Sequence, residues 1–278
     1  MPEPSAPGFP ERPSNDFMTH PPAAIRLVST DFDGTIHEDF AHAPIPDLFQ
    51  DRILEFQRRS GIWVINTGRH LASLLESLGR AKARVLPDFV VTVEREIHRH
   101  VRGHYEAVEP WHTACQSDHR EVFSRNESSI LALFAGLESR FDATFYADEW
   151  SPLCVIARSN AQMDAIQDEL GVFCRSVEAL VPVRNDVYLR LSHRGYSKGT
   201  ALQEIQRLTG LTAAQTCAAG DHLNDLPMLR REVAHWLITP SNGLPVVKDQ
   251  VRAEGGHLAL TPCAAGILEG LEAFGLFR

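Results

Sequence analysis

An apolar, β-prone run over residues 25–30 that ends in two carboxylates is the feature that most restricts the fold of this chain. It leads into Asp31-Phe32-Asp33-Gly34-Thr35, and side chains alternate along a strand, so an extended backbone would crowd Asp31 and Asp33 onto one side. Two carboxylates about 4 Å apart repel by about 4 kcal/mol at an effective dielectric constant of 20. A shared proton or a bound cation would offset this repulsion. The alternative is a solvated Asp-Gly turn after a strand.

A second strand-like run, residues 62–66, ends in Thr67-Gly68-Arg69 and is followed by a helix predicted over about residues 70–78. This arrangement suits phosphate binding, because backbone N–H groups and a helix N-terminus face the anion while the hydroxyl donates another bond. The structural alternative is a threonine that only caps the helix.

Two later segments also place polar residues ahead of a helix. Ser197-Lys198-Gly199-Thr200 opens one helical pattern, and the stretch 218–229 places Gly220-Asp221 and Asn224-Asp225 between a strand-like run and a helix. A surface lysine and an N-cap aspartate are the ordinary explanations of these residues. Because all four segments occur in this order, it is improbable that the ordinary explanation is correct for every one of them.

Taken together, these segments resemble the four signature motifs of the haloacid dehalogenase (HAD) superfamily of phosphohydrolases. The motifs are Asp31-x-Asp33-Gly34-Thr35, Thr67-Gly68-Arg69, Lys198-Gly199 and Gly220-Asp221-x-x-Asn224-Asp225. The second and fourth are most similar to the Cof-type branch and to sucrose-phosphatase-like relatives with a type IIB cap. The resemblance spans nearly all of the chain from residue 25 onward.

The resemblance implies an α/β fold, with a Rossmann-like parallel-sheet HAD core and an inserted α+β cap domain. The periodicity agrees, because apolar strand-like runs alternate with helical patterns, as in parallel sheets covered on both faces. We therefore expect a catalytic core over residues 23–85 and 192–278 and an inserted cap over 86–191. The elements expected inside the cap include two helices and a strand: residues 119–138, 161–170 and 172–177.

Composition excludes several other classes of protein. The 278 residues carry a formal net charge of -9 without a basic stripe, which argues against a nucleic-acid binder. No apolar run is long enough to span a membrane. Residues 1–22, rich in proline, serine and glutamate, predict a disordered N-terminal tail instead of a secretory or transit peptide. The five cysteines are scattered without a C-x-x-C pair and fit free thiols in a reducing cytoplasm.

Phosphoryl transfer needs a nucleophile, a proton donor for the leaving oxygen and positive charge around the other oxygens. Asp31 is the candidate nucleophile, because a carboxylate can form an aspartyl-phosphate. Asp33 is the candidate general acid and then the base for water, and the resemblance implies the same two roles. Thr67 and Gly68 would bind the phosphoryl group, and Lys198 would neutralise its charge. A cation at a helix N-terminus opposes the helix dipole unless an anion lies nearby, which favours a functional Lys198 over a surface one.

The carboxylates at this edge of the sheet also predict a metal site. A hard cation with oxygen ligands, such as Mg²⁺, is their natural counterion. The resemblance implies that Asp31, the backbone carbonyl of Asp33 and Asp221 coordinate Mg²⁺. Asn224 and Asp225 would then orient ligands, water or the lysine from just outside that set.

The residues that bind the rest of the substrate are harder to predict. Val93-Glu94-Arg95-Glu96-Ile97 replaces the Asn-Gly-Ala or Gly-Thr-Glu turn of many relatives. Arg95 is a candidate for contacting a second anionic group or, alternatively, a surface residue in a hairpin. The histidines at 98, 100 and 104 fit the exposed face of a strand better than a Zn²⁺ site.

Four further residues are open candidates for the cleft. Arg184, Asn185 and Tyr188 precede the return of the chain to the core and would line the cleft. His37 would approach the leaving group or simply cover its own loop.

The sequence thus predicts a Mg²⁺-dependent phosphatase that hydrolyses small phosphomonoester metabolites, with sugar phosphates as the favoured class, through an aspartyl-phosphate. Its partner would be a small phosphorylated metabolite, with no nucleic acid and no membrane, and the oligomeric state is left open. A phosphomutase is one alternative, although the insertion such enzymes carry within the fourth motif is absent. A non-catalytic binding protein is another, and the presence of Asp31, Asp33 and Lys198 argues against it.

Overall fold

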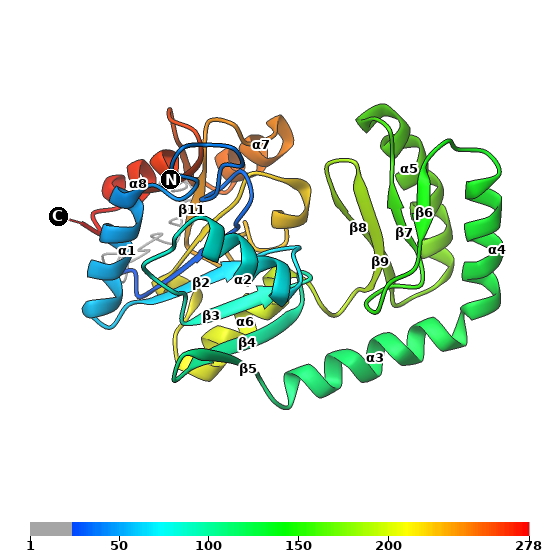
Figure 1. The fold of residues 1–278 in the computed structure, drawn as a ribbon, viewed down its shortest axis with the longest axis horizontal. Coiled ribbons are helices and arrows are strands. Elements are labelled where there is room, and N and C mark those ends of the chain that lie inside the picture. Colours follow the sequence, from blue (N-terminus) through cyan, green and yellow to red (C-terminus); the bar gives the residue numbers. More distant parts are fainter. Residues whose placement is uncertain (1–23, 278) are drawn as a thin grey trace, which may run out of the picture.

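The computed structural model describes residues 24–277, so the predicted tail over residues 1–22 lies outside the described part of the chain. Figure 1 shows two α/β units, of which the larger contains both ends of the described chain and the smaller is built from the middle of the sequence. The larger unit is built on an eight-stranded sheet and the smaller on a four-stranded sheet.

The eight-stranded sheet has the order β12-β11-β10-β1-β2-β3-β4-β5. Strands β12 to β3 in this order run parallel, and β4 and β5 extend the sheet as an antiparallel hairpin. The parallel strands are β1 (Leu27–Thr30), β2 (Ile62–Asn66), β3 (Phe89–Thr92), β10 (Thr216–Ala219), β11 (Trp236–Thr239) and β12 (His257–Leu258). The hairpin strands are β4 (Glu96–Val101) and β5 (His104–Ala107).

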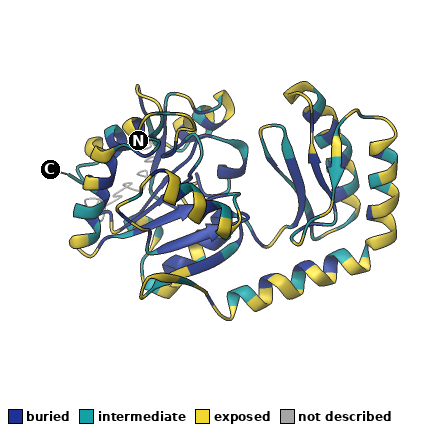
Figure 2. Cartoon of the chain, in the orientation of Figure 1, coloured by how far each residue is buried: buried dark blue, intermediate teal, exposed yellow. Residues whose placement is uncertain are grey.

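Helices cover both faces of this sheet. One face carries α1 (Asp47–Arg58), α2 (Leu71–Arg80) and α8 (Cys263–Ala273), and the other carries α6 (Lys198–Thr209) and α7 (Pro245–Ala253). Along β1, Val28 packs in the apolar core of the first face and Leu27 in that of the second. Figure 2 shows the strands of the larger unit as mostly buried. The predicted α/β core with a parallel-dominated sheet is confirmed.

The smaller unit is the expected α+β insertion. Its antiparallel sheet has the order β6-β7-β9-β8 and its own apolar core, and Figure 1 shows β8 and β9 nearest to the larger unit. Its helices are α3 (Trp111–Arg125), α4 (Glu127–Glu138) and α5 (Asn160–Ser176). Its strands are β6 (Thr144–Tyr146), β7 (Cys154–Ile156), β8 (Leu180–Asn185) and β9 (Tyr188–His193).

The boundary expected at residue 86 is corrected by the topology of the sheet. Strand β3 pairs in parallel with β2, and its Phe89 and Val91 pack in the core of the larger unit. The hairpin of β4 and β5 continues the same sheet, so the first element of the smaller unit is α3.

Two elements expected inside the insertion are also corrected. Residues 172–176 continue α5 instead of forming a strand, because Met163, Ile166, Leu170 and Cys174 recur at helical spacing and are all buried. The single helix expected over residues 119–138 is two helices that meet at Asn126.

Candidate active site

The carboxyl ends of three adjacent strands meet at one edge of the larger sheet. Asp31 follows β1, Thr67 follows β2 and Asp221 follows β10. Ligands bind at this edge in open α/β sheets. The turn between β8 and β9 faces the same edge, since the Asp186 N–H donates to the His222 ring at 3.2 Å. The predicted site residues therefore lie between the two units.

Lys198, the first residue of α6, is completely buried between two carboxylates. Its Nζ lies 2.5 Å from Asp31 Oδ1 and 2.6 Å from Asp225 Oδ1. Burial opposes the charge on the ammonium group, but the two carboxylates outweigh it and raise the pKa of Lys198. The alternative of a solvent-facing lysine is therefore wrong, and a permanent cation touches the candidate nucleophile.

Both carboxylate oxygens of Asp225 accept hydrogen bonds that hold this arrangement in place. While Oδ1 accepts from Lys198, Oδ2 accepts from the backbone N–H groups of Asp221 at 2.9 Å and His222 at 2.8 Å. Asp225 is completely buried. Its carboxylate thus joins α6 to the loop after β10 and orients the lysine.

The same edge holds a group of oxygen donors that suits a cation. Asp31, Asp221 and Asp225 each offer a carboxylate oxygen, and these atoms lie within 4.8 Å of one another. Burial raises the pKa of Asp31 well above its usual range and that of Asp221 to about 7, with Lys198 acting in the opposite direction. One lysine does not balance three buried carboxylates, and a hard divalent cation would restore the balance.

Gly34 lets the first motif pack against this donor set. Its φ is +76°, and a Cβ at this position would lie 2.5 Å from Asp221 Oδ2. The Thr35 hydroxyl donates to Asp221 Oδ1 at 2.7 Å. Because both Asp225 oxygens are already bonded, Asp31 and Asp221 are the side chains with room for a cation.

Asp33 is held by Arg69, a residue of the second motif for which the sequence predicted no role. Arg69 forms a two-point contact with it, with Nε 2.7 Å from Oδ2 and Nη2 2.6 Å from Oδ1. Burial alone would raise the pKa of Asp33, but the neighbouring His37 and Arg69 lower it. The ring of His37 lies 3.4 Å from the Asp33 carboxylate and stacks on Phe32, so it covers the loop.

Thr67 and Gly68 form the loop after β2, close to the fourth motif. Thr67 is 1% exposed, and its Oγ1 accepts from the Arg69 N–H at 3.2 Å, which leaves the hydroxyl hydrogen available to a ligand. A Cβ at Gly68 would lie 2.9 Å from Glu94 Oε1, and the same oxygen accepts from Asn224 at 3.1 Å. Glu94 therefore belongs to the site, although no local sequence signal indicated it.

Arg95 is neither an anion-binding residue nor a surface residue. It is buried and donates to Ser192 Oγ at 3.0 Å and to the Trp150 carbonyl at 2.6 Å. Trp150 in turn stacks on His70 at the start of α2, with ring centroids 5.3 Å apart. Arg95 thus joins the smaller unit to the larger one.

Arg184 is also a structural residue. Its guanidinium donates to Asp164, Gln167 and Asn160 inside the smaller unit. Tyr188 instead lies beneath Arg190, whose guanidinium carbon is 5.0 Å from the ring centroid. Arg190, two residues further along β9, donates to the Gly68 carbonyl at 3.4 Å. This strand thus reaches the loop of Thr67 and Gly68, the predicted phosphate loop.

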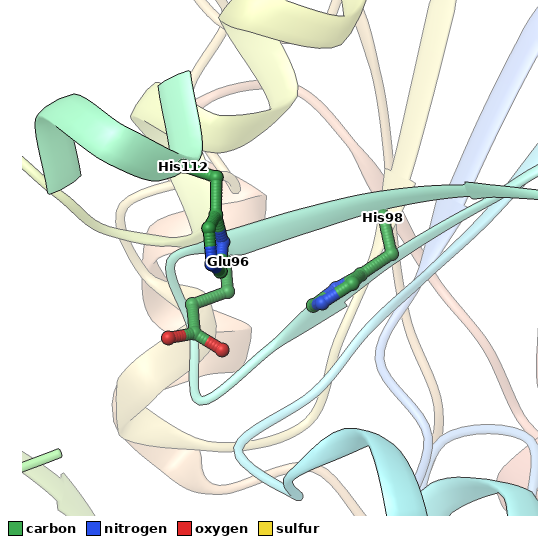
Figure 3. Close-up of side chains that lie close together, drawn as sticks. All are labelled: Glu96, His98 and His112. Atoms are coloured by element: carbon green, nitrogen blue, oxygen red, sulfur yellow. The ribbon is translucent and has the colours of Figure 1, made fainter. Parts of the chain in front are cut away.

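The three alternating histidines do not form a common site, and the exposed face expected for them is wrong for His98, which is buried. His104 contacts Glu106, and the ring of His100 packs against Tyr105. Figure 3 shows His98 instead beside Glu96 and His112, and donor atoms of these three residues lie within 4.8 Å of one another. This group lies between β4 and α3, apart from the carboxylates of the first and fourth motifs.

A large cavity in the smaller unit lies apart from the motif carboxylates. It has a volume of about 630 Å³ between α3, α4 and the loop 147–152, and it contains none of the motif carboxylates. We therefore locate the reaction centre from Asp31, Lys198 and Asp221. Arg95 and Trp150 line the cavity, and Arg95 donates to the Trp150 carbonyl there.

The fold and this arrangement of motif residues define a phosphatase of the HAD superfamily, a hydrolase of phosphoric monoesters. The family model described as sucrose-6F-phosphate phosphohydrolase matches residues 24–275, and the chain belongs to this family. No curated protein matches the chain in sequence. Within residues 24–277, no helix combines the length and apolar character needed to cross a membrane.

Solved structures share the fold over nearly the whole chain. The sucrose-phosphatase of Synechocystis sp. PCC6803, solved with sucrose and phosphate, is 18% identical, with a TM-score of 0.66, over 91% of this chain and 99% of that one. A HAD subclass IIB sugar phosphatase is 16% identical, with a TM-score of 0.64, over 91% and 100%. A HAD-like hydrolase from Bacillus subtilis is 20% identical, with a TM-score of 0.56, over 92% and 94%. At these identities the similarity shows a common fold.

Proposed function

We propose that this protein is a Mg²⁺-dependent phosphatase that hydrolyses small phosphomonoester metabolites, with sugar phosphates as the favoured class, through an aspartyl-phosphate on Asp31. The observation that carries the proposal is the buried Lys198, held between Asp31 and Asp225 at the edge where the phosphate loop also ends. The family match and the likeness to a sugar phosphatase and a sucrose-phosphatase support the substrate class.

In this mechanism Asp31 attacks the phosphorus, and the bond from phosphorus to the leaving oxygen breaks as Asp33 protonates that oxygen. Asp33 then takes a proton from water, which attacks the phosphorus and releases Asp31. Lys198, the Thr67 hydroxyl and the Gly68 N–H stabilise charge on the transferred group. Because Arg69 lowers the pKa of Asp33, proton donation requires this pair to separate, and Asp33 serves as a base while it is paired.

The donor set fits Mg²⁺. Its oxygens come from carboxylates, as this ion prefers, and Gly34 places no Cβ against Asp221 Oδ2. Asp31, Asp221 and the Asp33 backbone carbonyl would hold the ion. When bound, it would polarise the phosphoryl oxygens and balance the buried carboxylates.

We further propose that residues 111–193 act as a cap over this site. Three contacts support this role: Asp186 with His222, Arg190 with Gly68, and Trp150 with His70. A cap that closes over a bound metabolite excludes bulk water from the aspartyl-phosphate.

The proposed setting is the cytoplasm, with a small phosphorylated metabolite as the partner. All five cysteines are free thiols, and four of them are buried. Free cysteines of this kind fit a reducing compartment.

The test is phosphate release with Mg²⁺ from a panel of sugar phosphates and other phosphomonoesters. Asp31→Asn keeps the shape of the side chain but removes the nucleophile, so we expect kcat to fall by at least about 10⁴-fold. Asp249→Asn, at an exposed position on α7, is the matched control and keeps full activity. Retained turnover in Asp31→Asn would remove Asp31 as the nucleophile. Absence of release from every ester by folded, Mg²⁺-loaded wild type would refute the phosphatase.

A further inference from the structure

We propose that Arg190 forms a subsite for a carboxylate on the leaving group, so that the preferred substrates are phosphomonoesters of hydroxy or sugar acids. This inference rests on the proposed phosphatase function. It starts from a buried arginine on β9 whose hydrogen bonds are incomplete. Arg190 is 6% exposed and forms no ion pair within the described residues. Burial opposes its charge, although Glu94 lies near enough to raise its pKa.

The hydrogen bonds of Arg190 are incomplete. Nη2 donates to the Gly68 carbonyl at 3.4 Å, and Nε and Nη1 are buried without a partner among the described residues. Buried N–H donors without a hydrogen-bond partner are costly, and the nearby Glu94 and the Tyr188 ring stabilise the charge of Arg190 without filling these donors. A ligand anion would supply the missing partner.

The other buried arginines show that this fold otherwise satisfies such groups. Arg184 donates to an aspartate, a glutamine and an asparagine, and Arg95 donates to a hydroxyl and a carbonyl. Arg190 lies on the strand next to that of Arg184. Incomplete bonding is thus a property of the position facing the phosphate loop.

The geometry of the guanidinium favours a planar, two-oxygen ligand. The guanidinium has two donor edges: one is formed by N–H groups of Nε and Nη2, and the other by N–H groups of Nη1 and Nη2. The Gly68 carbonyl accepts from at most one hydrogen of Nη2 with good geometry. The other edge therefore keeps two parallel N–H donors. A carboxylate matches such an edge with two hydrogen bonds.

The position of Arg190 assigns it to the leaving group instead of the phosphoryl group. It belongs to β9 of the smaller unit, and its contact is Gly68, next to the Thr67 hydroxyl. Lys198 and the phosphate loop already serve the phosphoryl oxygens. Arg190 would therefore contact the part of the ester that extends toward the cap.

The experiment compares acid and alcohol esters of equal length. The long pair is 6-phosphogluconate and glucitol 6-phosphate, and the short pair is 3-phosphoglycerate and glycerol 3-phosphate. We expect kcat/KM of the wild type to favour the acid in at least one pair. Arg190→Met should lower kcat/KM for that acid by about 100-fold and for its alcohol by less than about 3-fold. Arg190→Lys keeps the charge but not the two donors, and should fall between them.

Two further measurements separate recognition from structure. Arg194→Met removes an exposed arginine from the same segment and should leave both members of each pair unchanged. Because Arg190 also packs on Tyr188 and lies near Glu94, Arg190→Met is compared by its Tm as well: a lower Tm together with equal losses for acid and alcohol would show a structural role.

The outcomes are distinct. Equal losses for acid and alcohol, or no preference for the acid in either pair, would overturn the carboxylate subsite while leaving the phosphatase intact. Failure to hydrolyse any of the four esters or p-nitrophenyl phosphate would instead count against the proposed function itself.

Discussion

The two units of this protein both bury a cation where they meet, but the bonding of the two cations differs. In the larger unit, Lys198 is fully buried and bonded to two carboxylates. In the smaller unit, Arg190 is almost as buried and has no carboxylate partner. The comparison indicates that the proposed catalytic groups are paired before substrate binds, whereas the proposed recognition side leaves N–H donors for the substrate to fill.

Metal removal should have the largest effect, and it tests whether the carboxylates of the larger unit need a cation. If the larger unit needs a hard cation to balance Asp31, Asp221 and Asp225, chelation should lower activity by at least about 10³-fold. Added Mg²⁺ should restore it, and Ca²⁺ should restore less than about a tenth, because its looser coordination spoils in-line geometry. Phosphate release before and after dialysis measures both effects. Full activity without metal, or with Ca²⁺, would contradict the assignment.

Substitution of the buried lysine should affect both activity and folding. Lys198→Met leaves Asp31 and Asp225 buried without their cation, which typically lowers the free energy of unfolding by about 3–5 kcal/mol. Urea unfolding at neutral pH measures this loss. Arg190→Met is the matched change in the other unit and should show no comparable loss. Equal losses of unfolding free energy in the two variants would mean that Lys198 and Arg190 contribute equally to stability, against the difference in bonding described above.

Most of the larger unit's site could be predicted because it consists of short motifs after strands. A local pattern of strand, loop and helix predicts the position of each of these residues: Asp31, Thr67, Lys198 and Asp221. Arg69 lay inside such a motif, but its contact with Asp33 is set by side-chain directions that a sequence does not give.

The smaller unit was less predictable for physical reasons. The hairpin of β4 and β5 was assigned to it because strand patterns do not reveal which sheet a strand joins. Glu94 and Arg190 are distant in sequence and meet the phosphate loop only through tertiary packing. Such residues leave no periodic or motif signal, so the substrate side of the cleft required the structure.

A glycine substitution gives a smaller test of the metal site. Gly34→Ala introduces a Cβ 2.5 Å from Asp221 Oδ2 at a φ of +76°, so it should weaken Mg²⁺ binding as well as stability. Gly210→Ala is the control, with a φ of +67° and no atom within 4 Å of the added Cβ. It should lose only about 1 kcal/mol of stability to backbone strain. The Mg²⁺ concentration for half-maximal activity separates the two, and equal values would count against a metal beside Gly34.

The smallest expected effect concerns pH and the smaller unit. His119 accepts from the His193 N–H at 3.0 Å, and burial lowers its pKa from 6.5 to about 3. Between these values the unfolded chain takes up a proton and the folded protein does not, so stability falls as the pH falls. At pH 5.5 the loss should be about 1 kcal/mol.

His119→Gln keeps an acceptor but does not titrate, so it should reduce this dependence; part remains, because burial also lowers the pKa of His98 to about 4. His104→Gln, at an exposed position, should leave it unchanged. Thermal unfolding of the three proteins from pH 7 to pH 5 gives the comparison. Identical slopes for the wild type and His119→Gln would show that His119 does not set the acid sensitivity.

The most direct test of the account is to trap the phosphoryl group on the protein. In the Asp33→Asn variant water lacks its base, so the aspartyl-phosphate should accumulate when the Mg²⁺-loaded enzyme is mixed with p-nitrophenyl phosphate and quenched in acid. Mass spectrometry of the peptides should then place one phosphoryl group on Asp31, and none in the Asp31→Asn, Asp33→Asn double variant. Turnover by the wild type with no phosphoprotein, or with the phosphoryl group on another residue, would contradict the central claim.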